Sequence, residues 1–318
     1  MKRKYMIIVL MAGALELTGC SQGTSNSAKN GTTGSENTII SESDIAILDT
    51  EDMFTERDRD TEYDESECTA ISLSDEETKC DSDGVKMDGQ TVTITEGGTY
   101  LLTGSLSNGS VVVDTDKTEK VQLILENVSI INEEGAGICV EQADKVFITL
   151  ADGSTNKIVS NSFTGNEDTN IDGAIFSRED LTLNGSGTLK ITSAAHGIVS
   201  KDDLVLTGGV YQIQSEKQGL SGKESVRIAD ETFTITSGTD AIHSEDTDED
   251  TKGFVYITGG VLTLAAGGDG ISSSYVVQAD GGSFDISTSS TETDTSTKGI
   301  KAQKYVILKD GTYQLATA

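Results

Sequence analysis

The 318-residue chain contains no proline and no tryptophan, and its 23 lysines and arginines face 53 aspartates and glutamates, a formal charge of −30. Because inner strands of a sheet need every backbone N–H group, the absence of proline suits a chain made mostly of strands, and the 34 glycines can supply bends. No basic patch is present to release counterions from phosphates, which argues against a nucleic-acid partner. The composition indicates an acidic, β-rich, elongated protein.

Cysteine and histidine are scarce, with four and two residues. Cys68 and Cys80 could pair in an exported protein, but their spacing carries no metal signature. Cys139 lies in an alternating segment, where a small core or surface residue is expected. His196 and His243 are interpreted as turn residues rather than catalysts. No Gly-rich loop opens a helix and no Ser/His/Asp spacing stands out, so neither nucleotide binding nor triad hydrolysis is predicted.

The N-terminus lacks an apolar run long enough to span a bilayer, but it has the form of an export signal. Basic residues precede a mostly apolar stretch and the sequence Leu17-Thr18-Gly19-Cys20, which resembles a bacterial lipobox. We expect residues 1–19 to be a lipoprotein signal peptide, and a lipid on Cys20 to hold a monomer on the extracellular face of a bacterial cell membrane. The alternative is an ordinary signal peptide with an incidental cysteine.

The chain is rich in one short pattern, which returns six times between Ala174 and Ala318. Each copy opens with a small residue and an aliphatic one, and closes with a large apolar residue two positions before an aliphatic one. The opening pairs are Ala174-Ile175, Gly197-Ile198, Gly219-Leu220, Ala241-Ile242, Gly270-Ile271 and Gly299-Ile300. The closing pairs are Leu189/Ile191, Tyr211/Ile213, Phe233/Ile235, Leu262/Leu264, Phe284/Ile286 and Tyr313/Leu315. The openings lie 23, 22, 22, 29 and 29 residues apart, and a period of this size indicates stacked units, two of them enlarged.

Within each unit apolar residues recur at every second position, which is typical of strands, and three short strands fit into one unit. One coil alone would not fold, because about six buried apolar side chains gain roughly 1.5–3 kcal/mol each, while backbone ordering costs about 1–2 kcal/mol per residue. Stacked coils also satisfy each other's backbone groups. The sequence predicts an all-β, single-stranded parallel β-helix, with an antiparallel β-sandwich as the alternative.

Two segments lie between the expected signal peptide and the β-helix. Residues 20–43 are polar and are expected to form a flexible tether. Residues 44–84 are strongly acidic, yet they contain spaced apolar anchors such as Phe54 and Ile71, so we expect an N-terminal cap over the first coil rather than disorder.

The β-helix is expected over residues 85–318, with looser early coils and an insertion at residues 160–172. The sequence stops as a sixth unit closes, without a cap, and we expect the β-helix to be incomplete at this end.

Acidic residues collect at the departures from the repeat. The first enlarged unit contains Glu245-Asp246-Thr247-Asp248-Glu249-Asp250, and stacking should place Asp240 and Asp269 on the same edge. Because calcium prefers several oxygen ligands, including carboxylates, we expect a calcium site here. Its candidate ligands are Asp240, Glu245, Asp246, Asp248, Asp250 and Asp269. Asp172, Asp202 and Asp203 form a weaker second candidate with Asp168, since Asp pairs are also common in turns. A solvated acidic loop is the alternative.

Several blocks of sequence carry a family resemblance. Early blocks are Phe54-Thr55-Glu56-Arg57-Asp58, Tyr63-Asp64-Glu65-Ser66, Val92-Thr93-Ile94 with Gly98-Thr99-Tyr100, and Lys145-Val146-Phe147-Ile148-Thr149-Leu150-Ala151-Asp152-Gly153. Later blocks are Asp240-Ala241-Ile242-His243-Ser244-Glu245-Asp246, Gly253-Phe254-Val255-Tyr256-Ile257, Gly268-Asp269-Gly270-Ile271-Ser272 and Lys298-Gly299-Ile300-Lys301. In these the chain resembles the carbohydrate-binding-domain β-helix lipoproteins of Clostridia. The resemblance implies a right-handed β-helix shaped like pectate lyases, bound calcium, and affinity without demonstrated catalysis for pectin-type acidic polysaccharide and cellulose.

The expected function is therefore calcium-dependent binding of polygalacturonate, pectin or cellulose. A domain this acidic should repel a polyanion unless cations bridge the carboxylates or a local basic site exists. One alternative is a calcium-dependent polysaccharide lyase, which needs a base. The cations available near coil edges are Arg178, Lys201, Arg227 and Lys301. The other alternative is a surface adhesin that uses the solenoid as a structural stalk.

Overall fold

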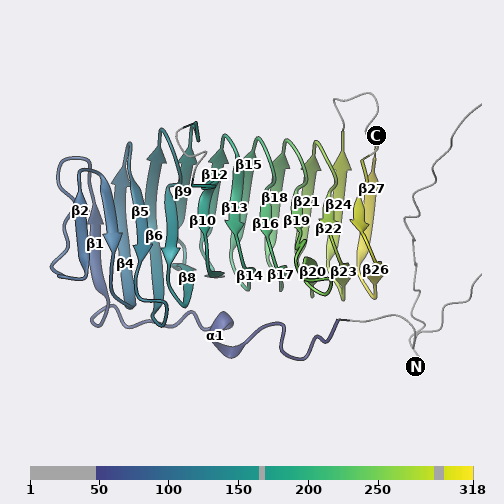
Figure 1. The fold of residues 1–318 in the computed structure, drawn as a ribbon, viewed down its shortest axis with the longest axis horizontal. Helices are drawn as coiled ribbons and strands as arrows, with labels where there is room; N and C mark the ends of the chain where they lie inside the picture. The colour runs from purple at the N-terminus through teal and green to yellow at the C-terminus, as the bar shows by residue number, and fades with distance from the viewer. Residues whose placement is uncertain (1–47, 165–168, 290–296, 318) are drawn as a thin grey trace, which may run out of the picture.

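The computed structural model describes residues 48–164, 169–289 and 297–317. Cys20, the expected signal peptide and tether, and Asp168 lie outside these residues. The described chain forms one four-residue helix, α1 (Glu56–Arg59), and 27 strands that stack into a parallel β-solenoid (Figure 1). The parallel β-helix predicted from the repeat is confirmed. Within the described ranges no helix is long and apolar enough to cross a membrane.

The solenoid has three faces. The first face is a ten-stranded sheet of β2 (Val85–Asp88), β3 (Thr91–Ile94), β5 (Ser110–Asp114), β7 (Ile138–Gln142), β10 (Gly173–Ser177), β13 (His196–Ser200), β16 (Leu220–Gly222), β19 (Ile242–Ser244), β22 (Ile271–Ser273) and β25 (Ile300–Ala302). The other two faces belong to a 17-stranded sheet.

The second face contains β8 (Lys145–Leu150), β11 (Asp180–Gly185), β14 (Asp203–Leu206), β17 (Ser225–Ile228), β20 (Phe254–Ile257), β23 (Val276–Ala279) and β26 (Tyr305–Leu308). The third face contains β9 (Thr155–Ser160), β12 (Thr188–Ser193), β15 (Val210–Ser215), β18 (Thr232–Ser237), β21 (Val261–Ala266), β24 (Ser283–Thr288) and β27 (Thr312–Ala316).

Register explains the sequence repeat. The opening aliphatic residues pair directly from coil to coil, as Ile198 does with Leu220 and Leu220 with Ile242. The closing pairs stack in the same way, and the rings of Tyr211 and Phe233 lie 4.8 Å apart and nearly parallel. These columns form the buried core of the solenoid. Because like side chains stack on like, each coil provides the packing surface for the next.

In the early coils, single long strands bend from one face of the solenoid to the next, and the repeat did not predict this. β1 (Thr69–Leu73) pairs with β4 (Gly98–Leu106), which pairs with the 13-residue β6 (Lys120–Asn132). β6 pairs with both β8 and β9, so it passes from the second face to the third. Its bend lies at Asn127, which has a φ of 56, a conformation that asparagine tolerates better than most residues. β2 and β3 form an antiparallel hairpin at the N-terminal end.

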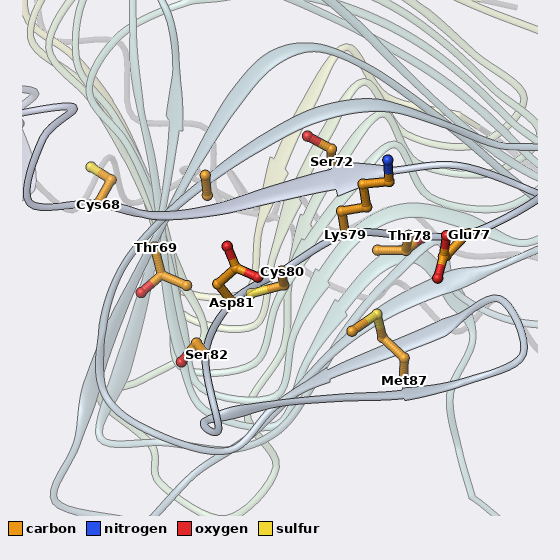
Figure 2. Close-up of a pocket in the computed structure, with 11 residues that line it drawn as sticks. Cys68, Thr69, Ser72, Glu77, Thr78, Lys79, Cys80, Asp81, Ser82 and Met87 are labelled. Atoms are coloured by element: carbon orange, nitrogen blue, oxygen red, sulfur yellow. The ribbon is translucent and has the colours of Figure 1, made fainter.

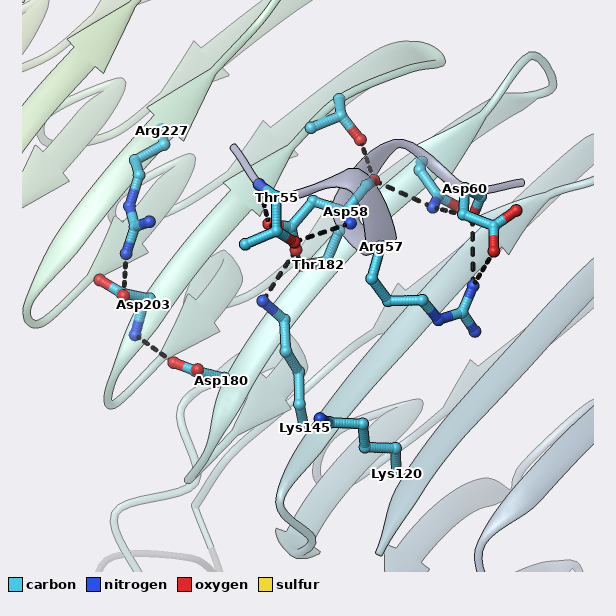
Figure 3. Close-up of polar contacts among 12 residues, drawn as sticks. Thr55, Arg57, Asp58, Asp60, Lys120, Lys145, Asp180, Thr182, Asp203 and Arg227 are labelled. Carbon is cyan, nitrogen blue, oxygen red and sulfur yellow. Dashed lines mark hydrogen bonds and ion pairs between the residues drawn. The ribbon is translucent and has the colours of Figure 1, made fainter. Parts of the chain in front are cut away.

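The segment expected to cap the first coil divides into two parts. β1 pairs with β4 in the first coils, but residues 48–60, here called the strap, run along the outside of the second face (Figure 1). Asp58 is 1% exposed, and its Oδ1 lies 2.8 Å from Lys145 Nζ and accepts a hydrogen bond from Thr182 (Figure 3). Arg227 Nη1 donates to the carbonyl of Met53. The strap therefore covers the second face across β8, β11 and β17.

Candidate functional groove

Two insertions lie beside the first face. The described parts of the first, residues 161–164 and 169–172, follow β9, and the acidic insertion, residues 245–250, follows β19. Between them a hollow of about 370 Å³, here called the groove, lies on the outer side of β13, β16 and β19. Its charged and titratable lining residues are Asp172, His196, Lys201, Lys223, His243 and Glu245.

Strand alternation explains how these side chains reach the groove. Ile198, Leu220 and Ile242 point into the core, so their neighbours Val199, Ser221 and His243 point outward. Lys201 and Lys223 each follow the last residue of their strand, on successive coils. The backbone N–H of Lys223 donates to the carbonyl of Ser200 at 3.0 Å, which fixes this register. Stacking thus places the two ammonium groups on one side of the groove.

One end of the groove is closed by an apolar cluster on the outside of the first face. Phe176, Val199 and Cys139 are buried there, and Ile171 from the first insertion packs against them. Burial raises the pKa of the Cys139 thiol, so this side chain stays protonated and acts as a small packed residue. The packing of Ile171 therefore places the next residue, Asp172, in the lining of the groove.

The groove lysines are paired with insertion carboxylates. Lys201 Nζ lies 3.5 Å from Asp172 Oδ1. Lys223 Nζ lies 2.7 Å from Asp248 Oδ2 and 4.0 Å from Asp246 Oδ2. Side chains of Lys201 and Lys223 remain about two fifths exposed, at 39% and 40%. Both cations can therefore meet a ligand from solvent.

The two histidines also face the groove, so their interpretation as turn residues is wrong. His196 begins β13 and His243 lies in the middle of β19. His196 Nδ1 accepts the backbone N–H of Gln218 at 3.2 Å, and its Nε2 lies 3.5 Å from Asp172 Oδ2. Burial lowers the pKa of His196 to about 4, so the imidazole is neutral at pH 7. Aligning the columns of the repeat would have revealed their outward direction.

The residues proposed for the first calcium site are only partly brought together. Asp240 and Asp269 do share an edge, because the backbone N–H of Asp269 donates to Asp240 Oδ1 at 2.7 Å. Asp240 Oδ2, however, lies 3.0 Å from His243 Nδ1, and Glu245 Oε2 lies 3.7 Å from its Nε2. Lys301 Nζ lies 2.8 Å from Asp269 Oδ2. These carboxylates are satisfied by nitrogen groups.

The remaining candidates are dispersed. Asp203 pairs with Arg227 on the second face, away from Asp172 in the groove. Burial, Asp180 and Glu224 raise the pKa of Asp202 to about 6.

In the ranges that the structure describes, no group of three or more His, Cys, Asp or Glu side chains is placed to hold a metal ion. Among the described residues the expected ligands, Asp250 included, form no such group, and calcium binding stays a prediction.

The four cationic side chains considered for a lyase also lie in different parts of the structure. Arg178 Nε lies 2.6 Å from Glu141 Oε2, Arg227 is bound to Asp203 beside the strap, and Lys301 is bound to Asp269. Of these four cations, Lys201 is the one that lines the groove.

A larger hollow of about 760 Å³ lies at the N-terminal end (Figure 2). Its lining side chains include Lys79, Met87 and the two cysteines Cys68 and Cys80, which are both free thiols. Every residue that lines this hollow precedes residue 88.

A family of known proteins matches the part of the chain that contains the groove but not the part that contains the N-terminal hollow. Residues 88–318 match the model of the family described as carbohydrate-binding domain-containing proteins, a range that contains the whole lining of the groove and none of the N-terminal hollow. A curated relative from Acetivibrio thermocellus, also named a carbohydrate-binding domain-containing protein, is 34% identical over 137 residues. This alignment covers 42% of the chain and 48% of the relative, so the chain matches about half of that protein's length.

A solved structure has the same architecture. It is described as a polysaccharide lyase-like protein from C. thermocellum, as a gadolinium derivative, and is 31% identical to this chain with a TM-score of 0.70. The match covers 77% of this chain and 100% of that one. Since the family model spans well over half of the sequence, the chain belongs to the family of carbohydrate-binding domain-containing proteins.

Proposed function

We propose that the groove binds an acidic, pectin-type polysaccharide and does not cleave it. The observation that carries this proposal is the pair Lys201 and Lys223, which lie on successive coils in a hollow within the family-matched range. Ammonium groups bind carboxylates through charge-assisted hydrogen bonds. Adjacent coils stack about 4.8 Å apart, so a chain of uronate sugars lying along the solenoid can present one carboxylate to each lysine.

The proposal relies on local rather than overall charge. The chain as a whole carries −30 and repels a polyanion at long range. In the groove the two lysines offset Asp172 and Glu245, and His196 is neutral. The lining of the groove is thus close to neutral, and its two ammonium groups can bind carboxylates without a bridging cation.

The binding proposed here does not use calcium. Calcium would need carboxylate oxygens that are free to turn toward one point, and those of Asp240 and Asp269 are held by nitrogen groups. We therefore expect a chelator to leave polysaccharide binding unchanged.

Affinity electrophoresis of the full chain tests the proposal. Gels with polygalacturonate should retard the protein, gels with a neutral cellulose derivative should retard it much less, and a chelator should not alter either result. Equal mobility in all gels would contradict the binding proposal. Retardation that chelator abolishes would favour calcium bridging instead.

A calcium-dependent lyase is the second candidate, favoured by His196. A neutral imidazole at pH 7 can accept a proton, and Lys201 nearby can neutralise a uronate carboxylate. Incubation with polygalacturonate and calcium would then produce unsaturated products that absorb in the ultraviolet. Binding without any rise in absorbance supports a non-catalytic role.

The location of the protein is also a proposal. Cys20 follows Leu17-Thr18-Gly19, and we infer that its acylation anchors the protein outside the cell membrane. Radiolabelled palmitate should enter the wild type but not C20A, and C20A should be released from membranes. Labelling of C20A would rule out this anchor.

A further inference from the structure

Each groove lysine already holds a carboxylate that belongs to an insertion. Asp172 faces Lys201 at 3.5 Å, and Asp248 faces Lys223 at 2.7 Å. These are the positions that the carboxylates of a bound acidic glycan would take. In the free protein the insertions thus occupy the cations with their own side chains.

The two aspartates beside Lys223 differ in how firmly they are held. The Asp246 carboxylate is 2% exposed, and its Oδ1 accepts the backbone N–H groups of Asp248 at 2.7 Å and Glu249 at 2.9 Å. Asp246 is therefore a fixed part of the turn. The Asp248 side chain is 70% exposed and is bound by Lys223. An exposed ion pair of this kind contributes little free energy, so Asp248 can leave Lys223 at small cost.

We propose that Asp248 is a built-in competitor for the groove: its carboxylate occupies Lys223 in the free protein and is displaced by a carboxylate of the acidic glycan. This inference rests on the proposed function and names how the same site is regulated. Because Asp248 is on the same chain, it competes at a high effective concentration. A ligand with one carboxylate must displace Asp248 with that single contact to Lys223. A polyuronate can bind Lys201 with a second carboxylate at the same time. Asp248 thereby selects for closely spaced carboxylates.

Isothermal titration calorimetry with an oligogalacturonate at low salt tests the competition. The variant D248N keeps the size of the side chain but removes its charge, and it should bind about two- to fivefold more tightly than the wild type. D250N is the matched control, because it removes the same charge from the same insertion, whereas the carboxylates that face Lys223 are those of Asp246 and Asp248. Its gain should be clearly smaller. In the K223M background, D248N should give no gain.

The outcomes separate the inference from the proposed function. Binding by the wild type with an equal affinity for D248N would overturn the competition and leave the groove intact as a binding site. An equal gain in D248N and D250N would also overturn it, because the effect would then be long-range charge. Failure of both the wild type and D248N to bind would reject the proposed function itself.

Discussion

A buried glutamate interrupts a column of glycines just before the strands of the third face. Glu231 is 2% exposed and stands where the neighbouring coils have Gly209 and Gly260. Its carboxyl lies near Tyr211, and among the described atoms its Oε2 has no hydrogen-bond partner. Burial raises the pKa of Glu231 to about 7. Removing this carboxyl from water disfavours its charged form, so the folded protein prefers it protonated.

The first prediction concerns stability against pH. Because the folded-state pKa of Glu231 is raised above its unfolded value, its contribution is fully present below about pH 4.5 and is lost as pH rises through about 7. We expect E231Q to be more stable than the wild type at pH 8, by at most about 3 kcal/mol, and similar to it at pH 4.5. Thermal melts at both pH values measure the difference. An E231Q advantage that is the same at both would contradict this account.

At the scale of elements, the repeat predicted the strands whose side chains stack on equivalent side chains of the neighbouring coils. The columns of Ile198 and Tyr211 follow from period and alternation, which is why the parallel β-helix could be predicted. The strap could not, because Asp58 meets Lys145 and Thr182, 87 and 124 residues away, and no local pattern records such contacts. Sequence did place Asp240 beside Asp269. It did not show that His243 and Lys301 would take up their carboxylates.

The second prediction concerns the strap. D58A leaves Lys145, whose side chain is only 16% exposed, without its carboxylate, and we expect a loss of about 3–5 kcal/mol in the free energy of unfolding of the strap from the second face. D60A is the control, since Asp60 forms an exposed pair with Arg57, and it should cost under about 1 kcal/mol. Limited proteolysis and urea unfolding report the release of the strap. If D58A and D60A were cleaved at equal rates, the buried ion pair would not hold the strap.

At the scale of the whole molecule, the three faces have different exposure. The strap covers the second face, and the third face presents a flat row of exposed side chains that includes Lys157 and Lys190. The first face carries both insertions and the groove. Two of the departures from the repeat therefore lie beside the proposed binding site. The regular coils supply the spacing that sets Lys201 and Lys223 on successive turns.

The most direct measurement compares two pairs of lysines on the same molecule. Lys201 and Lys223 lie on successive coils in the groove, and Lys157 and Lys190 are paired in register on successive coils of the third face. Titration calorimetry with oligogalacturonate should show that K201M/K223M binds at least about tenfold more weakly, because hydrogen bonds to charged groups contribute about 1.5–3 kcal/mol each. K157M/K190M, with the same net charge, should bind as the wild type does. Equal losses in the two variants would mean that overall charge, and not the groove, determines binding.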